Sequence, residues 1–449
     1  MADNVLPFPY GVHPTQPVAQ FIRLGELQYQ SLGTLLAEGK LPAKRIVVDA
    51  SKIRHQRELI KAFKETGAEI VLDTKAAELA SPQKCAGFAK GAPWAALNDG
   101  KPLGPEFFSA GRADDIFGQI ARCAIDYQCG AVLAPCHFIG DKLFGDWFDV
   151  DRQACLLLRQ ALDNAGGAHI AIDYSLIVPH VQLNDPDRRS TFVSGLEGLP
   201  FDNLWIRASG FGNDATALPA TRYMSALTGL HNIGRPIVAD YLGGIIAEAA
   251  LAFGVISGIA HGIGERERFS AYGWEKPPPK SEDGFGGRAR RIVLSRLNRS
   301  FTLSEFELLC SARGGRQLLI GTNRSRFPSN MQDMLQDPQG YVASEAMHHV
   351  DALAGIPDLR RGQHFLQGRM TDVARVARQV KDLKPLKEKA AEKEIDADKL
   401  MKRLSDHSAK IDKLHSSFEY LNADLEERGG RAQAVTRGTP APGMHRRQP

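Results

Sequence analysis

Short apolar runs, each ending in a polar or charged residue, recur along the first 300 residues of the chain. Stretches whose apolar residues follow helical spacing separate most of these runs. β-branched residues fill the runs almost without interruption, which is typical of parallel strands covered by helices on both faces. We identify seven such runs, at residues 45–49 (RIVVD), 69–73 (EIVLD), 131–137 (AVLAPCH), 169–173 (HIAID), 204–207 (LWIR), 236–240 (PIVAD) and 254–261 (GVISGIAH).

The alternation of strand-like runs with helical stretches predicts an α/β protein, a (β/α)8 or TIM-like barrel. A barrel of this kind needs one more strand, which we place at residues 291–297 (RIVLSRL), with 317–321 (QLLIG) as the competing choice. We expect residues 21–32 to form a helix that leads into the first strand. The Gly-, Pro- and Ala-rich stretch 80–111 has no clear period, so we expect a loop over the mouth of the barrel.

At 449 residues the chain is longer than one barrel of about 250 residues. We therefore predict a barrel over 1–300, an appendage or small α/β extension over 301–370, a long helical segment over 371–428 and a disordered basic tail over 429–449. Apolar residues at intervals of three and four from 383 to 425 favour a C-terminal coiled coil, within one chain or between chains. A single amphipathic helix packed on the barrel is the alternative. A coiled coil over residues 383–425 predicts a homo-oligomer or a protein partner.

The chain lacks an apolar stretch approaching the ~20 residues that span a bilayer, and its first residues lack the order of a secretory signal. We therefore expect no membrane association and a cytoplasmic location. The six cysteines form no C-x-x-C pair, and no H-x-H or H-E-x-x-H motif occurs. These absences favour reduced thiols, no bound metal and no cofactor.

The polar residues at the strand ends are the candidate catalytic groups, because the carboxyl ends of parallel barrel strands meet at one rim. Carboxylates gathered there allow one to act as a proton donor while another serves as base or nucleophile. Each Asp has the alternative role of capping the next helix, and the first histidine of the set is equally well explained as a core residue. The candidate catalytic residues are Asp49, Asp73, His137, Asp173, Asp240 and His261.

Two features favour a phosphate-bearing ligand. Residues 284–327 hold nine arginines, no lysine and only two acids, and the planar guanidinium matches phosphate oxygens. The late segment 261–266 (HGIGER) has two glycines that let backbone N–H groups approach an anion. Solubilising arginines and a plain tight turn are the alternatives. The candidate phosphate-binding residues are Arg207, Gly262, Gly264, Arg266, Arg288, Arg290 and Arg291.

Residues 236–269 (PIVADYLGGIIAEAALAFGVISGIAHGIGERERF) place a glycine turn and an Ala-rich helix between two strands. This unit resembles the late βα unit of the tRNA-guanine transglycosylase barrels, which exchange a base on tRNA through an Asp nucleophile. The chain departs from that family, because His261 stands where the nucleophile would fall and the zinc-binding cysteines are absent. The resemblance transfers no catalytic residue and implies a nucleotide or nucleic-acid substrate.

These observations together predict a TIM-barrel enzyme that acts on a phosphate-bearing substrate such as a nucleotide, RNA or DNA. The expected chemistry is carboxylate acid/base or nucleophilic catalysis, for example transfer or hydrolysis of a glycosidic bond. The alternative is a catalytically inactive barrel that serves as an oligomeric scaffold through its C-terminal coiled coil. A metal-dependent hydrolase with Asp and His ligands ranks third.

Overall fold

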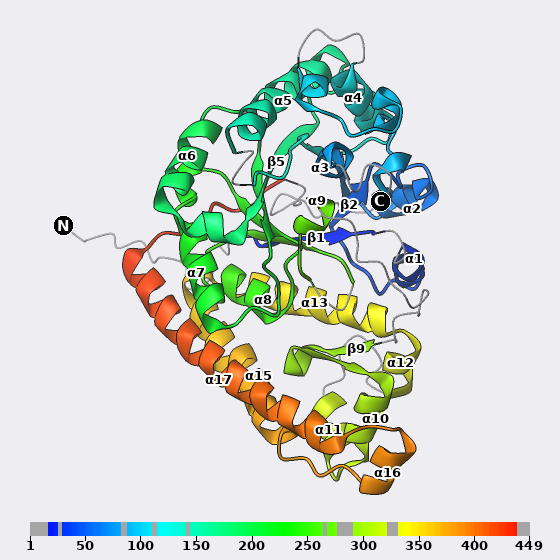
Figure 1. The fold of residues 1–449 in the computed structure, drawn as a ribbon, viewed down its shortest axis with the longest axis vertical. Helices are drawn as coiled ribbons and strands as arrows, with labels where there is room; N and C mark the ends of the chain where they lie inside the picture. Colours follow the sequence, from blue (N-terminus) through cyan, green and yellow to red (C-terminus); the bar gives the residue numbers. More distant parts are fainter. Residues whose placement is uncertain are drawn as a thin grey trace, which may run out of the picture.

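The computed structural model describes residues 17–25, 29–81, 88–109, 115–140, 144–263, 267–275, 291–320 and 331–437. Eight parallel strands close into a barrel in chain order, which confirms the predicted fold class (Figure 1). The strands are β1 (Ala19–Arg23), β2 (Arg45–Asp49), β3 (Glu69–Asp73), β4 (Ala131–Leu133), β5 (Ala171–Pro179), β6 (Asn203–Ser209), β7 (Ile237–Asp240) and β8 (Gly258–His261).

The first strand is the one that the sequence interpretation misplaced. Residues 19–23, close to the start of the expected helix, form β1, which pairs with β2 on one side and β8 on the other. The predicted eighth strand is instead β9 (Arg291–Leu294), which forms a separate antiparallel hairpin with β10 (Arg299–Thr302). Alternate residues of β9 are buried, as in a half-exposed hairpin, whereas barrel strands are buried on both faces. Residues 317–320 of the competing segment lie in helix α11 (Gly315–Ile320).

Helices surround the barrel and continue into a second layer below it in Figure 1. The helices that follow the barrel strands are α1 (Tyr29–Ala37), α2 (Arg57–Glu65), α3 (Ala76–Ala80), α4 (Ile116–Asp126), α5 (Phe144–Asn164), α6 (Pro186–Leu196), α7 (Ala217–Thr228), α8 (Gly244–Ala252) and α9 (Tyr272–Glu275). The later helices are α10 (Leu303–Ser311), α11, α12 (Met331–Gln336), α13 (Pro338–Ala354), α14 (Asp358–His364), α15 (Thr371–Val380), α16 (Lys387–Glu392) and α17 (Ala397–Arg428). A π-helix, Phe365–Met370, joins α14 to α15.

The barrel interior is a packed apolar core. Side chains of alternate strand residues meet on the axis, among them Phe21, Val47, Val71, Trp205 and Val238. The rings of Phe21 and Trp205 meet edge to face with centroids 4.7 Å apart. Because this layer fills the middle of the barrel, charged side chains are confined to its two ends.

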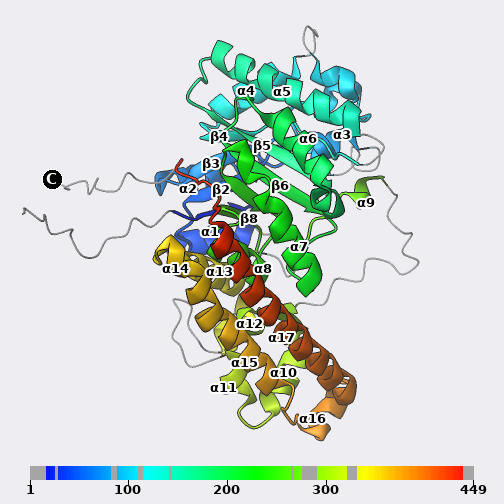
Figure 2. The same ribbon diagram turned by 90° about the vertical axis from the view of Figure 1, so that its left-hand side faces the viewer.

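The later helices form an extension beside the barrel. Helix α17 runs along α15 and also crosses α7, so that it joins the extension to the barrel (Figure 2). Its apolar seam, including Leu404, Ile411 and Phe418, is buried within this chain. Residues 371–428 are three helices rather than one, and Glu394, between α16 and α17, has a positive φ of 53°. Pairing with a second chain stays a prediction.

The stretch 80–111 contains three short 3-10 helices, Phe88–Gly91, Ala95–Asn98 and Pro105–Phe108. Trp94 is fully buried within it, and its indole N–H donates to the backbone oxygen of Thr74, next to the end of β3. Gly91 lies against the loop after β2, where an added Cβ would come within 2.3 Å of the Ser51 oxygen. The described part of this stretch therefore packs beside the carboxyl end of the barrel.

The C-terminal segment up to Arg437 takes a defined path along the barrel, although its composition predicts disorder. The backbone N–H of Ala432 donates to the oxygen of Gly254, and Val435 is buried within the barrel's interior core. Arg437 reaches the amino-terminal end of the barrel, where its guanidinium contacts Asp173. This end of the barrel is thus covered by the end of the described chain.

Candidate active site at the carboxyl end of the barrel

Five charged side chains face the barrel axis at the carboxyl ends of its strands. They are Arg23, Asp49, Asp73, Arg207 and Asp240, from β1, β2, β3, β6 and β7. Each lies two residues after a residue of the interior core. Because successive side chains of a strand point to opposite faces, residues two apart point to the same face. The structure therefore brings four predicted site residues together and adds Arg23.

Arg23, Arg207, Asp73 and Asp240 form a closed arginine–aspartate ring. Arg23 binds Asp240 through Nε and Nη2, at 2.7 and 2.6 Å, and Asp73 through Nη1 at 2.9 Å. Arg207 donates from Nε to Asp240 and from Nη2 to Asp73, each at 2.6 Å. Each guanidinium thus bridges both carboxylates, which compensates the charges of four buried side chains.

Asp49 and Lys75 lie beside the ring. The Lys75 ammonium is 3.6 Å from Asp49 and 2.5 Å from Glu78, and the backbone of Lys75 adopts the left-handed conformation with φ at 57°. The side chain of Asp49 is 16% exposed, compared with 2% for Asp73 and none for Asp240. Among these three aspartates, Asp49 is therefore the carboxylate closest to solvent.

The surrounding charges keep Asp73 ionised. Burial raises the pKa of Asp73, but Arg207, Lys75 and Arg23 outweigh burial and hold that pKa well below its usual range. Burial raises the pKa of the Tyr241 phenol to about 12, so this side chain keeps its proton at neutral pH. The guanidinium of Arg23 lies 4.3 Å from the centre of the Tyr241 ring. The site therefore combines a fixed carboxylate with a protonated phenol.

An aromatic cap closes the mouth above the ring. Phe269 stacks on Tyr241 with centroids 5.3 Å apart and meets Trp274 edge to face at 5.4 Å. The backbone N–H of Gly210 donates to the oxygen of Phe269, and Ser81 donates through Oγ to the oxygen of Trp274. Residues 267–275 thus connect the end of β6 with the end of α3 across the mouth.

Asp173 is not at this rim, which corrects the prediction. The apolar run continues beyond it, so β5 extends to Pro179 and Asp173 is only its third residue. Its carboxylate accepts hydrogen bonds from Asn203 and Trp205, and it is paired with Arg437. The residue therefore belongs to the amino-terminal end of the barrel, where barrel side chains serve stability.

The two candidate histidines also face away from the ring. His137 follows the end of β4 by four residues, stacks on Trp147 at 3.9 Å and contacts Asp151 of α5 through Nδ1 at 2.5 Å. His261 alternates with the interior residue Ala260 and therefore points outward, where its Nε2 lies 2.7 Å from the side-chain amide of Gln20. Burial lowers the pKa of His261. Their imidazoles do not join the carboxylates of the ring.

The structure places the predicted phosphate-binding residues in different parts of the protein. Arg207 lies in the ring, and the N–H of Gly262 lies 3.4 Å from a carboxylate oxygen of Glu267. Arg291 is in β9, where its guanidinium donates to the hydroxyl and backbone oxygens of Ser300. Gly264, Arg266, Arg288 and Arg290 lie outside the described residues.

The sequence interpretation missed Arg23 and Lys75. Arg23 ends a segment that resembles a helix entry, so its position as the last residue of a strand was not recognised. Lys75 follows the carboxyl end of β3 by two residues, and that proximity to Asp73 was the available signal. Tyr241, which follows Asp240 in the chain, contacts Arg23 directly.

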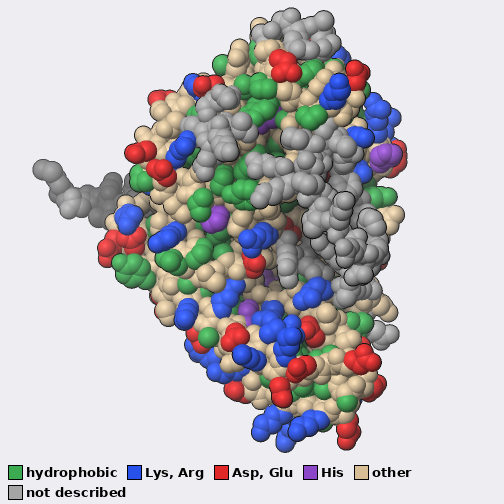
Figure 3. Space-filling model, in the orientation of Figure 1, with side chains coloured by type: hydrophobic (Ala, Val, Ile, Leu, Met, Phe, Trp, Pro, Cys, Tyr) green, Lys and Arg blue, Asp and Glu red, His purple; other side chains and the backbone are tan. Residues whose placement is uncertain are grey.

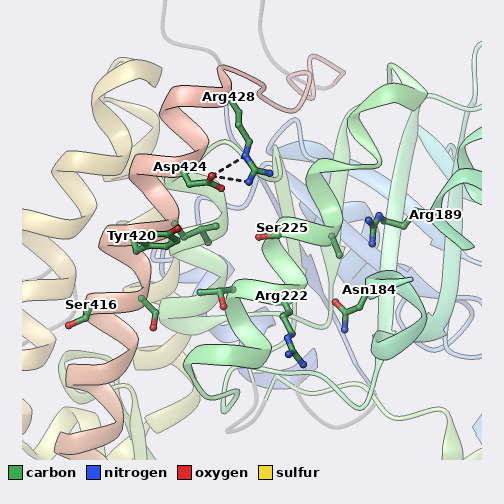
Figure 4. A pocket seen from close by; sticks show the side chains of 12 residues that line it. Asn184, Arg189, Arg222, Ser225, Ser416, Tyr420, Asp424 and Arg428 are labelled. Carbon is green, nitrogen blue, oxygen red and sulfur yellow. Dashed lines mark hydrogen bonds and ion pairs between the residues drawn. The ribbon is translucent and has the colours of Figure 1, made fainter. Parts of the chain in front are cut away.

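A separate open groove of about 870 Å³ lies between α7 and α17 (Figure 4). Arg222 and Ser225 line it from α7, while Ser416 and Tyr420 line it from α17. One of its three arginines, Arg428, is paired with Asp424 at 2.8 Å. The groove is therefore a polar surface feature away from the arginine–aspartate ring.

Comparisons with known proteins give no family assignment. No family model matches the chain, and no curated protein matches it. Among solved structures, the endo-1,4-beta-xylanase XylE of Penicillium canescens aligns with a TM-score of 0.36 and 11% sequence identity. That alignment covers 54% of this chain and 81% of the xylanase, and it carries no argument about the chemistry. No helix in the described ranges combines the length and apolar character needed to cross a bilayer.

Proposed function

We propose that the chain is a TIM-barrel enzyme whose active site is the arginine–aspartate ring with Asp49, Lys75 and Tyr241. Its substrate is a phosphate-bearing molecule of the nucleotide class. Its chemistry is carboxylate acid/base or nucleophilic catalysis, with transfer or hydrolysis of a glycosidic bond as the expected reaction. The observation that carries the proposal is the ring itself, because it concentrates arginine-paired carboxylates at the end of the barrel where enzymes of this fold react.

The surroundings of each group support a division of roles. Arg207, Lys75 and Arg23 keep Asp73 as a carboxylate, which suits a base or nucleophile and excludes a proton donor at neutral pH. Tyr241 keeps its proton, which suits the role of proton donor. Asp49 is the carboxylate most accessible to an entering substrate. Arg23 and Arg207 then position Asp240 and stabilise negative charge that develops nearby.

The aromatic cap requires that the substrate enter by displacing residues 267–275. Closure of the same segment would exclude water from the reacting groups, as loops over barrel mouths do. The stacked pair Phe269 and Tyr241 links this movement to the ring, because Tyr241 also contacts Arg23.

The test is a screen of the full chain against nucleosides, nucleotides and short RNA, with release of base, sugar or phosphate followed by chromatography. Asp240→Asn and Asp73→Asn, which keep side-chain size, should lower turnover by about 10²–10⁴-fold, the usual contribution of a proton-transferring group. Tyr241→Phe removes only the phenolic hydroxyl and should lower turnover as well.

The matched control is Asp173→Asn, which changes a buried aspartate at the opposite end of the same barrel. Turnover per folded molecule should be unchanged in this variant. Equal turnover in Asp240→Asn and the unaltered chain, or an equal loss in Asp173→Asn, would contradict the proposed site.

A second candidate function is a non-catalytic barrel that acts as a scaffold. The observation that favours it is the completeness of the ring, in which guanidinium groups already occupy both buried carboxylates. Light scattering of the full chain tests this function. Assembly above one chain without turnover in the screen would support the scaffold, whereas a monomer with turnover would argue against it.

A further inference from the structure

A cavity of about 300 Å³ lies between the β9–β10 hairpin, α17 and the loop after β6. It is lined by four cations, Arg291 and Arg299 from the hairpin and Arg403 and Lys410 from α17. Asp214 is the single carboxylate among its lining residues. We call this cavity the cationic pocket. Figure 3 shows Lys and Arg side chains gathered on this face, over the hairpin and α17.

Two of these cations donate hydrogen bonds to backbone oxygens. Arg299 donates to the backbone oxygen of Arg403 at 3.1 Å, and Lys410 donates to the backbone oxygen of Asp214 at 2.5 Å. The carboxylate of Asp214 is instead paired with Arg268, at 3.1 Å.

Arg403 is the cation with a carboxylate partner, Glu305, at 2.5 Å. Asp406 also attracts Arg299, although more weakly than Glu305 does. These acids do not remove the excess of positive charge at the lining, where four cations face one carboxylate that is already engaged.

Neighbouring cations destabilise the charged forms of Arg299 and Lys410. Burial lowers the pKa of Arg299, and the charges of Arg403 and Arg291 lower it further. Burial and Arg299 likewise lower the pKa of Lys410, against the attraction of Asp214. An anion placed among these groups would relieve the repulsion and gain several charge-assisted hydrogen bonds.

We propose that the cationic pocket binds a phosphate group of a small phosphorylated molecule. Guanidinium groups match phosphate oxygens in pairs, and an ammonium group adds a point charge. A cavity of about 300 Å³ is at the lower end of the range for small-molecule sites, which suits one phosphorylated sugar or nucleotide rather than a duplex.

The cationic pocket lies close to the mouth of the barrel. A smaller neighbouring cavity of about 70 Å³ shares Asn213, Val293 and Asn298 with it. That cavity is also lined by Gly243 and His261, which follow or end β7 and β8. The phosphate would therefore sit beside the carboxyl end of the barrel. This assignment rests on the proposed function only in taking the phosphorylated molecule to be the substrate. Phosphate binding itself can be measured independently of turnover.

The experiment is calorimetric titration of the full chain with inorganic phosphate and with a nucleoside monophosphate, at constant ionic strength set by chloride. Arg403→Gln and Lys410→Gln should each weaken phosphate binding about tenfold or more, because each removes a hydrogen bond to a charged group. Arg375→Gln is the matched control, since this exposed arginine on α15 binds Asp372 and Gln379 outside the pocket. The control variant should bind phosphate as the unaltered chain does.

Three outcomes would overturn the assignment. They are no phosphate binding by the unaltered chain, an equal loss in the control, and binding of short single-stranded RNA without binding of either small phosphate. Asp240→Asn separates this inference from the proposed function, because it should bind phosphate normally. Retained turnover in that variant would contradict the proposed active site but not the assignment of the phosphate pocket.

Discussion

Arg437 and Asp173 form a two-pronged ion pair that joins the end of the described chain to the inside of the barrel. Nη1 and Nη2 of Arg437 lie 2.8 and 2.7 Å from the two carboxylate oxygens of Asp173. Arg437 also pairs with Glu69, and its backbone oxygen accepts a hydrogen bond from Arg45 at 2.6 Å. The segment thus closes the amino-terminal end of the barrel, opposite the arginine–aspartate ring.

Replacement of Arg437 should destabilise the fold. Arg437→Ala leaves the fully buried carboxylate of Asp173 without its main counter-charge. Loss of one partner of a buried pair costs about 3–5 kcal/mol, and the partial exposure of Arg437 favours the lower end of that range. Denaturant unfolding measures the change. Arg428→Ala, which removes an exposed pair with Asp424, is the control and should cost less than about 1 kcal/mol. Equal destabilisation by both variants would contradict a closing role for Arg437.

Arg369 should be equally important for docking the helical extension on the barrel. It binds the carboxylate of Glu248 through Nε at 2.8 Å, and His349 lies 3.1 Å from the same carboxylate. Arg369→Ala leaves Glu248 buried with a weaker partner, so we expect a loss of about 3–5 kcal/mol in unfolding free energy.

A double variant sharpens this test. Arg369→Met combined with Glu248→Met removes both charges and should recover much of the lost stability, because no buried charge is then left alone. Arg375→Ala, at an exposed position on α15, should change stability by less than about 1 kcal/mol. No recovery in the double variant would mean that packing, rather than charge, connects the two parts.

His407 should make the protein less stable in mild acid. Burial lowers its pKa to about 4, while its Nε2 lies 2.8 Å from the backbone oxygen of Leu297. An unfolded histidine titrates near 6.5, so between about pH 6.5 and 4 the unfolded chain binds a proton that the folded chain does not. The contribution of His407 to the free energy of unfolding is therefore fully present above this window and is lost as the pH falls through it. Because each unit of pKa difference corresponds to about 1.4 kcal/mol, we expect a loss of about 3 kcal/mol.

The pH dependence is measured by denaturant unfolding at several pH values. His407→Gln keeps a donor for the Leu297 oxygen but does not titrate, so its stability should fall less between pH 6.5 and 4. His415→Gln, on the same helix, should keep the slope of the unaltered chain. If the stability of His407→Gln fell with pH as steeply as that of the unaltered chain, the pH dependence would come from other groups.

Strand periodicity was sufficient to predict the barrel and three of its inward aspartates. Asp49, Asp73 and Asp240 each end a short buried run, so the residue at the end of the pattern is also the end of the strand. The same rule failed for Asp173, because the apolar run passes through it to Pro179. A sequence pattern marks where polarity begins, whereas strand length depends on pairing with the neighbouring strands.

Contacts between segments that are distant in the sequence could not be predicted from its apolar pattern. The cationic pocket combines Arg299 with Lys410, and the amino-terminal closure combines Asp173 with Arg437. Nothing in the local spacing of these residues specifies their partners, since the packing of α17 and of the last segment decides them. β1 was missed because five residues are too few to distinguish a strand from a helix by period.

Removal of the Phe269 ring should open the barrel mouth without unfolding the barrel. The ring stacks on Tyr241 and contacts Trp274, so Phe269→Ala removes the apolar centre of the cap. Two amides report on the cap, because Gly210 donates to the Phe269 oxygen and Ala271 donates to the Ser209 hydroxyl, each at 2.9 Å. Hydrogen–deuterium exchange at both amides should accelerate, while barrel amides such as that of Val71 keep their rates. Tyr272→Ala, at a half-exposed position in the same segment, should have a smaller effect. Unchanged exchange at Gly210 and Ala271, or faster exchange throughout the barrel, would show that the cap does not open as a separate unit.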